Sequence, residues 1–82
     1  MARNKPRVVI YTTPACPSCV AAKTFLQKNR VEFVEINVAS DRAAAIEMIE
    51  KSGQMSVPVL DIDGKIIVGF DRDAIKRALK LP

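Results

Sequence analysis

Runs of β-branched residues alternate with amphipathic segments along the first half of the chain. Residues 7–12 read Arg-Val-Val-Ile-Tyr-Thr, which is typical of a strand buried on both faces. Pro14 and Pro17 interrupt this run, and apolar residues then recur at the i, i+4 spacing of a helix that ends near residue 30. Residues 32–37, Glu-Phe-Val-Glu-Ile-Asn, are predicted to form a second strand. A helix between two strands is a βαβ unit, so we expect these two strands to be parallel.

A second helix is predicted after the second strand. Ser40 or Asp41 is suited to its N-cap, the helix runs to about Lys51, and Gly53 supplies the left-handed residue that commonly follows a helix end. Its apolar positions predict an inward face formed by Ala45, Ile46 and Ile49.

The last third of the chain predicts a hairpin and a final helix. Residues 58–62 and 65–68 are apolar runs joined at Asp63-Gly64, and Asp-Gly between such runs is a strong signal for a tight antiparallel turn. Asp71 or Asp73 is suited to cap the final helix. The residues expected to face inward from that helix are Ala74, Ile75, Ala78 and Leu79. The resulting order, β-α-β-α-β-β-α, predicts an α/β fold with a four-stranded mixed sheet flanked by three helices, which is the thioredoxin-like arrangement in its smallest form.

Composition and charge narrow the possible classes of function. The chain has 82 residues, and we expect one domain over residues 1–82 with residues 1–6 as a flexible N-terminal arm. The net charge is +4, but nucleic-acid binders usually combine a basic stripe with exposed aromatic residues, and the four aromatic residues here lie in apolar segments. We therefore expect no nucleic-acid partner.

The cellular compartment of the protein determines whether its cysteines are expected to be reduced or paired. No apolar run approaches the ~20 residues that span a bilayer, and the N-terminal apolar stretch is shorter than the ~7–15 residues of a secretory signal. We expect a cytoplasmic monomer that does not bind membranes, in a compartment where most thiols are kept reduced.

The candidate chemistry lies in Cys16-Pro-Ser-Cys19, between the first strand and the first helix. Pro17 suits the first helical position, which places Cys16 at or beside the N-cap, where backbone amides and the positive end of the helix dipole stabilise a thiolate. Cysteines in such places have pKa values lowered from ~8.5 to ~3.5–7.5. Since the chain has no histidine, the expected sources of this stabilisation are the helix end and Lys23. Cys19 lies on the helix face of Leu26, so we expect it to be more buried and less ionised.

This asymmetry predicts different roles for the two sulfurs. Cys16 would attack a substrate disulfide and Cys19 would resolve the mixed disulfide, since the i, i+3 spacing brings the sulfurs within bonding reach. Zinc or iron–sulfur ligation remains an alternative that requires two chains, because two cysteines without histidine do not fill a four-ligand site. A structural disulfide and a redox sensor that does not turn over are further alternatives. We expect no metal site within one chain.

Three segments resemble the glutaredoxin family: Tyr11-Thr-Thr-Pro-Ala-Cys16-Pro-Ser-Cys19, Ser56-Val-Pro58 and Gly69-Phe-Asp71. The chain is most similar to short bacterial and archaeal glutaredoxin-like proteins with a Gly-Phe-Asp segment. The resemblance implies a cis peptide bond before Pro58, which the residues alone leave open. It also implies that the Val57 backbone binds a peptide or glutathione as an added strand. The implied substrate- or glutathione-binding residues are Thr13, Pro17, Val57, Pro58, Gly69, Phe70 and Asp71.

The chain departs from the usual family pattern at several positions. Ser18 replaces the tyrosine of Cys-Pro-Tyr-Cys, and threonines stand where many members place a lysine shortly before the first cysteine. Val68 and Arg72 depart from the usual Gly-Gly-x-Asp-Asp segment. The Gly-Phe pair resembles instead the glutaredoxin-like electron donors of ribonucleotide reductase, which take electrons from thioredoxin reductase.

The resemblance implies a thiol–disulfide oxidoreductase that reduces protein disulfides or mixed disulfides with glutathione. No metal or organic cofactor is expected, glutathione is the candidate co-substrate, and glutathione or thioredoxin reductase is the expected electron source. The alternatives are a thioredoxin-reductase-dependent electron donor of the ribonucleotide-reductase type and a non-enzymatic iron–sulfur carrier.

Overall fold

The computed structural model of the protein describes residues 6–81, and it has the predicted order of strands and helices. The predicted N-terminal arm lies outside the described residues, except for Pro6. The elements are β1 (Val8–Thr12), α1 (Pro17–Lys28), β2 (Val34–Asn37), α2 (Arg42–Ser52), β3 (Val59–Ile62), β4 (Lys65–Val68) and α3 (Arg72–Leu79).

The four strands form one mixed sheet in the order β2-β1-β3-β4. β1 pairs with β2 in parallel and with β3 antiparallel, and β3 pairs antiparallel with β4. The predicted parallel pair and hairpin are therefore confirmed, although β2 begins two residues later than the predicted strand 32–37. Asp63 and Gly64 join β3 to β4 with φ angles of 51° and 89°, which is the left-handed conformation that a two-residue hairpin turn requires.

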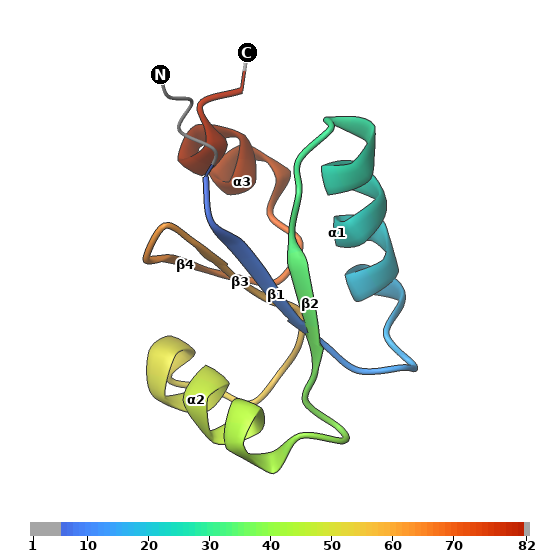
Figure 1. Ribbon diagram of the computed structural model, residues 1–82, viewed down its shortest axis with the longest axis vertical. Coiled ribbons are helices and arrows are strands. Elements are labelled where there is room, and N and C mark those ends of the chain that lie inside the picture. The colour runs from blue at the N-terminus through green and yellow to red at the C-terminus, as the bar shows by residue number, and fades with distance from the viewer. Residues whose placement is uncertain (1–5, 82) are drawn as a thin grey trace.

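α1 and α3 cover one face of the sheet and α2 covers the other (Figure 1). Each face has its own apolar core. On one face, residues from α1 and α3 pack with β1, β3 and β4, and fully buried members include Ile10, Leu26 and Ile75. On the other face, α2 packs against a smaller cluster around Tyr11 and Val59. Among the described residues, no helix is both long and apolar enough to cross a membrane.

The inward face of α2 differs from the sequence-based prediction. Ala44 and Met48 are the buried residues of this helix, whereas Ala45 and Ile49 are half-buried and Ile46 is 51% exposed. Apolar residues occupy four consecutive positions at the start of this helix, so its own pattern does not define one apolar face. Contact with the sheet therefore decides which residues are buried.

The Lys51 side chain, near the C-terminal end of α2, is hydrogen-bonded to the sheet. The Lys51 ammonium donates hydrogen bonds to the Asp61 carboxylate at 2.7 Å and to the Tyr11 hydroxyl at 2.9 Å. These bonds raise the pKa of Lys51 above its ordinary value, the bond to Asp61 contributing most. Burial raises the pKa of Asp61, but hydrogen bonds from Lys51 and from the Gly64 amide outweigh burial and hold this pKa below its ordinary value.

Lys51→Met is expected to lower the free energy of unfolding by about 1 kcal/mol, since a charged hydrogen bond is lost at a site that solvent partly screens. The raised pKa of Lys51 stabilises the fold below the ordinary lysine pKa, and this contribution is lost as pH rises through the folded value. The lowered pKa of Asp61 stabilises it above the ordinary aspartate pKa, and this contribution is lost as pH falls through the folded value. The difference between wild type and variant should therefore be greatest at about pH 5–9 and shrink below about pH 3.

Urea denaturation at several pH values measures this difference. Lys65→Met is the matched control, because Lys65 is an exposed lysine on β4. An equal loss of unfolding free energy in both variants, or a loss that does not vary with pH, would show that the contact between Lys51 and Asp61 does not stabilise the fold.

Candidate functional site

Cys16 occupies the N-cap of α1, as its position before Pro17 predicts. Its backbone is extended, Pro17 begins the helix, and the Cys16 sulfur accepts a hydrogen bond from the Cys19 amide at 3.1 Å. The Val20 amide donates to the Cys16 carbonyl at 3.1 Å and so closes the first turn. A helix N-terminus leaves amides without partners inside the helix, and here one of them points at the sulfur. The local fold therefore places a positive electrostatic environment on Cys16.

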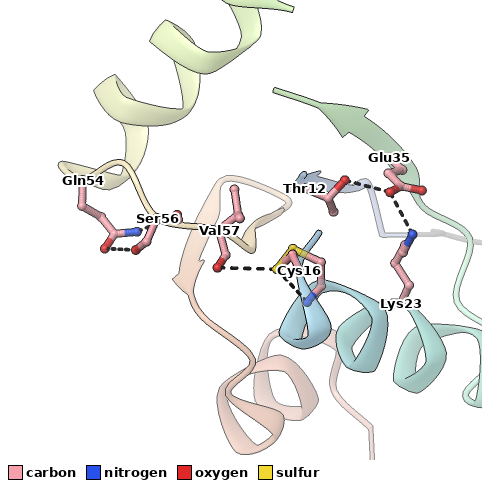
Figure 2. Close-up of a disulfide and its surroundings, with 8 residues drawn as sticks. Thr12, Cys16, Lys23, Glu35, Gln54, Ser56 and Val57 are labelled. Carbon is pink, nitrogen blue, oxygen red and sulfur yellow. Dashed lines mark hydrogen bonds and ion pairs between the residues drawn. A yellow bond between two sulfur atoms is a disulfide. The ribbon is translucent and has the colours of Figure 1, made fainter. Parts of the chain in front are cut away.

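Cys16 and Cys19 are joined by a disulfide, with their Cα atoms 5.2 Å apart (Figure 2). Cys16 is half-buried, whereas Cys19 is only 1% exposed and lies on the buried face of α1 with Ala22 and Leu26. The predicted difference in accessibility is confirmed. A second sulfur arriving from solvent meets Cys16 first.

The segment before β3 passes beside the disulfide. The Val57 carbonyl oxygen lies 3.9 Å from the Cys16 sulfur (Figure 2). The Val57–Pro58 peptide bond is cis, as the family resemblance implies, and Pro58 is buried. The Gly69 amide donates to the Pro58 carbonyl at 2.8 Å, which brings the end of β4 to the same place. The fold therefore assembles Cys16, Val57, Pro58 and Gly69 from segments far apart in the sequence.

Lys23, the cation expected to stabilise the Cys16 thiolate, is bonded to a carboxylate instead. The Lys23 ammonium forms an ion pair with the Glu35 carboxylate at 2.9 Å, and the Thr12 hydroxyl donates to the same carboxylate at 2.7 Å. The hydrogen bond from Lys23 and then that from Thr12 hold the pKa of Glu35 below its ordinary value. Lys23 is thus partnered by a carboxylate, and the helix end is the source of stabilisation that the geometry supports. Glu35 lies 12 residues beyond Lys23, and no sequence motif links the two residues.

Phe70 contacts another aromatic ring, and Asp71 caps a helix. Phe70 packs edge-to-face on Phe25, with ring centroids 5.8 Å apart, and the Arg72 guanidinium lies 5.7 Å from the centre of the Phe25 ring. The Asp71 carboxylate caps α3 by accepting from the Ala74 amide at 3.1 Å. A shallow depression on the surface includes Phe70, Asp71 and the first residues of α3.

The remaining candidate residues, Thr13 and Pro17, flank Cys16 in the sequence. Thr13 is half-buried and Pro17 is exposed. Within residues 6–81, no three His, Cys, Asp or Glu side chains are grouped so that they could hold a metal ion.

Both segments that border the disulfide are uncharged. Residues 12–22 contain no Asp, Glu, Lys or Arg, and neither do residues 52–60. The cations that adjoin these segments in the sequence, Lys23 and Lys51, both form ion pairs with carboxylates. Among these two segments, the helix end is therefore the source of positive electrostatic potential at Cys16.

Comparison with known proteins finds glutaredoxin and glutaredoxin-like sequences, as the motifs around Cys16 and Pro58 imply. The family model described as glutaredoxin matches residues 8–67. An uncharacterised glutaredoxin-like 8.6 kDa protein in a rubredoxin operon of Clostridium pasteurianum is 42% identical over 73 residues, which are 89% of this chain and 97% of the relative.

Solved structures share the fold. The crystal structure of a thioredoxin-like protein matches with a TM-score of 0.84 and 34% identity, covering 89% of this chain and all of that one. The structure of NrdH-redoxin from Escherichia coli, described as a glutaredoxin-like protein with a thioredoxin-like activity profile, matches with a TM-score of 0.77 and 31% identity. That match covers 87% of this chain and 92% of NrdH-redoxin. These likenesses confirm the thioredoxin-like fold expected from the order of elements.

Proposed function

Because the chain belongs to the glutaredoxin family and carries the redox-active pair Cys16–Cys19, we propose that this thiol–disulfide oxidoreductase reduces protein disulfides by a dithiol cycle. In the first step the Cys16 thiolate attacks one sulfur of the substrate disulfide. A Cys16–substrate disulfide forms, and the second substrate sulfur leaves as a thiolate, which takes a proton from water.

In the second step Cys19 loses its proton to water and attacks the Cys16 sulfur. The mixed disulfide breaks, the Cys16–Cys19 disulfide forms, and the remaining substrate sulfur leaves as a thiolate and is protonated. In total, two electrons and two protons pass from the dithiol to the substrate. An external reductant must then return two electrons before the next cycle.

The observation that carries this proposal is the environment of Cys16. Its sulfur accepts a hydrogen bond from the Cys19 amide at the helix end, and the Val57 carbonyl oxygen lies 3.9 Å from the same sulfur. The first contact favours a thiolate at the accessible cysteine. The second supports a role for the Val57 main chain in holding a substrate backbone beside the attacking sulfur. Pro58 supports this segment, and Thr13, Pro17 and Gly69 adjoin it as further candidate contacts.

We propose thioredoxin reductase as the electron source, with glutathione as the competing source. Glutathione carries two carboxylates at neutral pH. Residues 12–22 and 52–60 contain no cation to bind them, and Arg72, which follows the third segment at the site, lies over the Phe25 ring. One oxygen of the Asp71 carboxylate, the group that would bind the amino group of glutathione, accepts the Ala74 amide in capping α3. The likeness to NrdH-redoxin, whose activity profile is described as thioredoxin-like, supports the same choice.

A coupled assay tests the electron source. Purified protein, NADPH and a protein disulfide are combined either with thioredoxin reductase or with glutathione and glutathione reductase, and NADPH consumption is followed at equal protein concentration. We expect faster turnover with thioredoxin reductase. Faster turnover with glutathione would contradict this choice and would assign Gly69, Phe70 and Asp71 to a glutathione site.

We propose that the cycle runs in a cytoplasmic monomer without a metal or organic cofactor. The chemistry described above uses only the two sulfurs of one chain and an external reductant. An iron–sulfur carrier formed by two chains predicts visible absorbance in protein purified without oxygen, whereas the dithiol cycle predicts a colourless protein.

A further inference from the structure

The Gln54 side chain makes two hydrogen bonds to Ser56, the residue before Val57. Its amide nitrogen donates to the Ser56 carbonyl at 3.0 Å, and its oxygen accepts from the Ser56 hydroxyl at 2.7 Å (Figure 2). We propose that Gln54 is a positioning residue that orients the Val57 amide for hydrogen bonding to the main chain of the substrate. This inference rests on the proposed function, because it concerns how the Val57 main chain is prepared to hold a substrate backbone.

The bond to the Ser56 carbonyl determines the direction of the Val57 N–H. The C=O of Ser56 and the N–H of Val57 belong to one planar peptide group, and in a trans peptide group these two bonds point in opposite directions. Holding the Ser56 oxygen against the Gln54 amide therefore turns the Val57 N–H away from Gln54. Figure 2 shows Gln54 and Cys16 on opposite sides of Val57.

The Val57 carbonyl is held by a different part of the chain. It belongs to the next peptide group, whose other member, Pro58, is buried, and the Pro58 carbonyl accepts from the Gly69 amide at 2.8 Å. An added strand can exchange hydrogen bonds with both the N–H and the C=O of one residue, so both groups must keep a fixed direction. Pro58 thus fixes the acceptor of Val57, and Gln54 fixes its donor.

Gln54 is itself anchored to the end of α2. Gly53 takes a left-handed conformation after Ser52, the last residue of the helix. The Gln54 main-chain amide donates to the Ser52 hydroxyl oxygen at 3.3 Å, and this hydroxyl donates to the Met48 carbonyl at 2.7 Å. The orientation of the Gln54 side-chain amide follows from its partner, because the Ser56 carbonyl only accepts and must face the nitrogen. The Ser56 carbonyl is therefore linked to the helix through Gln54.

Two mixed disulfides with the same chromophoric aryl thiol distinguish this role from a general effect on the protein. One carries a cysteine peptide, with peptide groups on both sides of the cysteine, and the other carries mercaptoethanol, which has none. Release of the aryl thiol gives kcat/KM for each substrate. The ratio of the two values measures how much the main chain of the substrate contributes, and it does not depend on the fraction of a variant that is folded.

Gln54→Met is expected to lower this ratio by about 5- to 10-fold, mainly through a higher KM for the peptide, because the Val57 amide is no longer held in one direction. Gln54→Glu should lower it as much, since its carboxylate accepts from the Ser56 hydroxyl but offers no N–H to the Ser56 carbonyl. Gln27→Met is the matched control and should keep the wild-type ratio, because Gln27 is an exposed glutamine on α1.

A wild-type ratio in Gln54→Met would overturn this inference. A wild-type ratio in Gln54→Glu would also overturn it, by assigning the effect to the bond with the Ser56 hydroxyl. A wild type that reduces neither mixed disulfide would overturn the proposed function itself.

Discussion

Cys16→Ser is expected to lower the rate of disulfide reduction by at least about 10³-fold, because the hydroxyl that replaces the sulfur is not ionised near neutral pH. Cys16 is the accessible member of the pair, and the helix end points an amide at its sulfur. Cys19 is 1% exposed and does not replace it as the attacking group. Reduction of a protein disulfide under saturating reductant, followed by thiol release, measures the loss.

Ser18→Ala is the matched control for this variant. Ser18 is exposed, lies between the two cysteines and supplies no sulfur. Its replacement should leave the rate within about 3-fold of the wild type, as is usual for an exposed position with no special role. Retained turnover in Cys16→Ser would mean that Cys19 attacks the substrate and that the assigned roles are reversed.

Cys19→Ser is expected to stop the cycle after the first step. Cys16 keeps its position at the helix end, so it still attacks, but no second thiol is present to release the substrate. Turnover of protein disulfides should fall by about 10²-fold or more, while a stable Cys16–substrate disulfide accumulates. Intact-mass spectrometry under non-reducing conditions detects this adduct, and peptide mapping locates it.

The adduct distinguishes the dithiol cycle from other uses of the pair. Glutathione mixed disulfides should remain slow substrates of Cys19→Ser when free glutathione is supplied, because an external thiol then resolves the intermediate. A purely structural disulfide would give no adduct in this variant. Equal and complete loss in both cysteine variants, on protein and glutathione substrates alike, would contradict the asymmetric roles.

The elements that the sequence predicts correctly are those with local signals. Pro17 predicts the first residue of α1 and thereby places Cys16 at the N-cap. Gly53 takes the left-handed conformation at the end of α2, and Asp63–Gly64 forms the hairpin turn. Each of these conformations depends on the backbone preferences of one or two residues, so neighbouring sequence alone determines it.

The inward face of α2 depends on contacts that the local sequence does not contain. Apolar residues at positions 43–46 point in several directions around the helix, and burial of Met48 in place of Ile46 is decided by the sheet beneath. The start of β2 is likewise set by pairing, because Val34 is the first residue in register with β1, opposite Val9.

The sequence predicts the two cysteines but not the ion pair between Lys23 and Glu35. Lys23 and Glu35 are separated by 12 residues and meet only because β2 lies beside β1 under α1. Hydrogen bonds also join Gln54 and Ser56 in the loop before Val57, and no periodic pattern predicts them. Side-chain partners across elements therefore require the three-dimensional structure, even where the fold and the reacting atoms are predicted from the sequence.

The most direct test of the central claim follows both cysteines through one reaction. Fully reduced protein is mixed with one equivalent of an oxidised protein substrate, quenched with acid at intervals, alkylated and mapped by mass spectrometry. The dithiol cycle predicts that a Cys16-linked adduct rises and decays, that the Cys16–Cys19 disulfide appears as it decays, and that the substrate gains two thiols for each disulfide formed. A substrate that becomes reduced while Cys16 and Cys19 both remain thiols would contradict the account, as would an adduct that forms on Cys19.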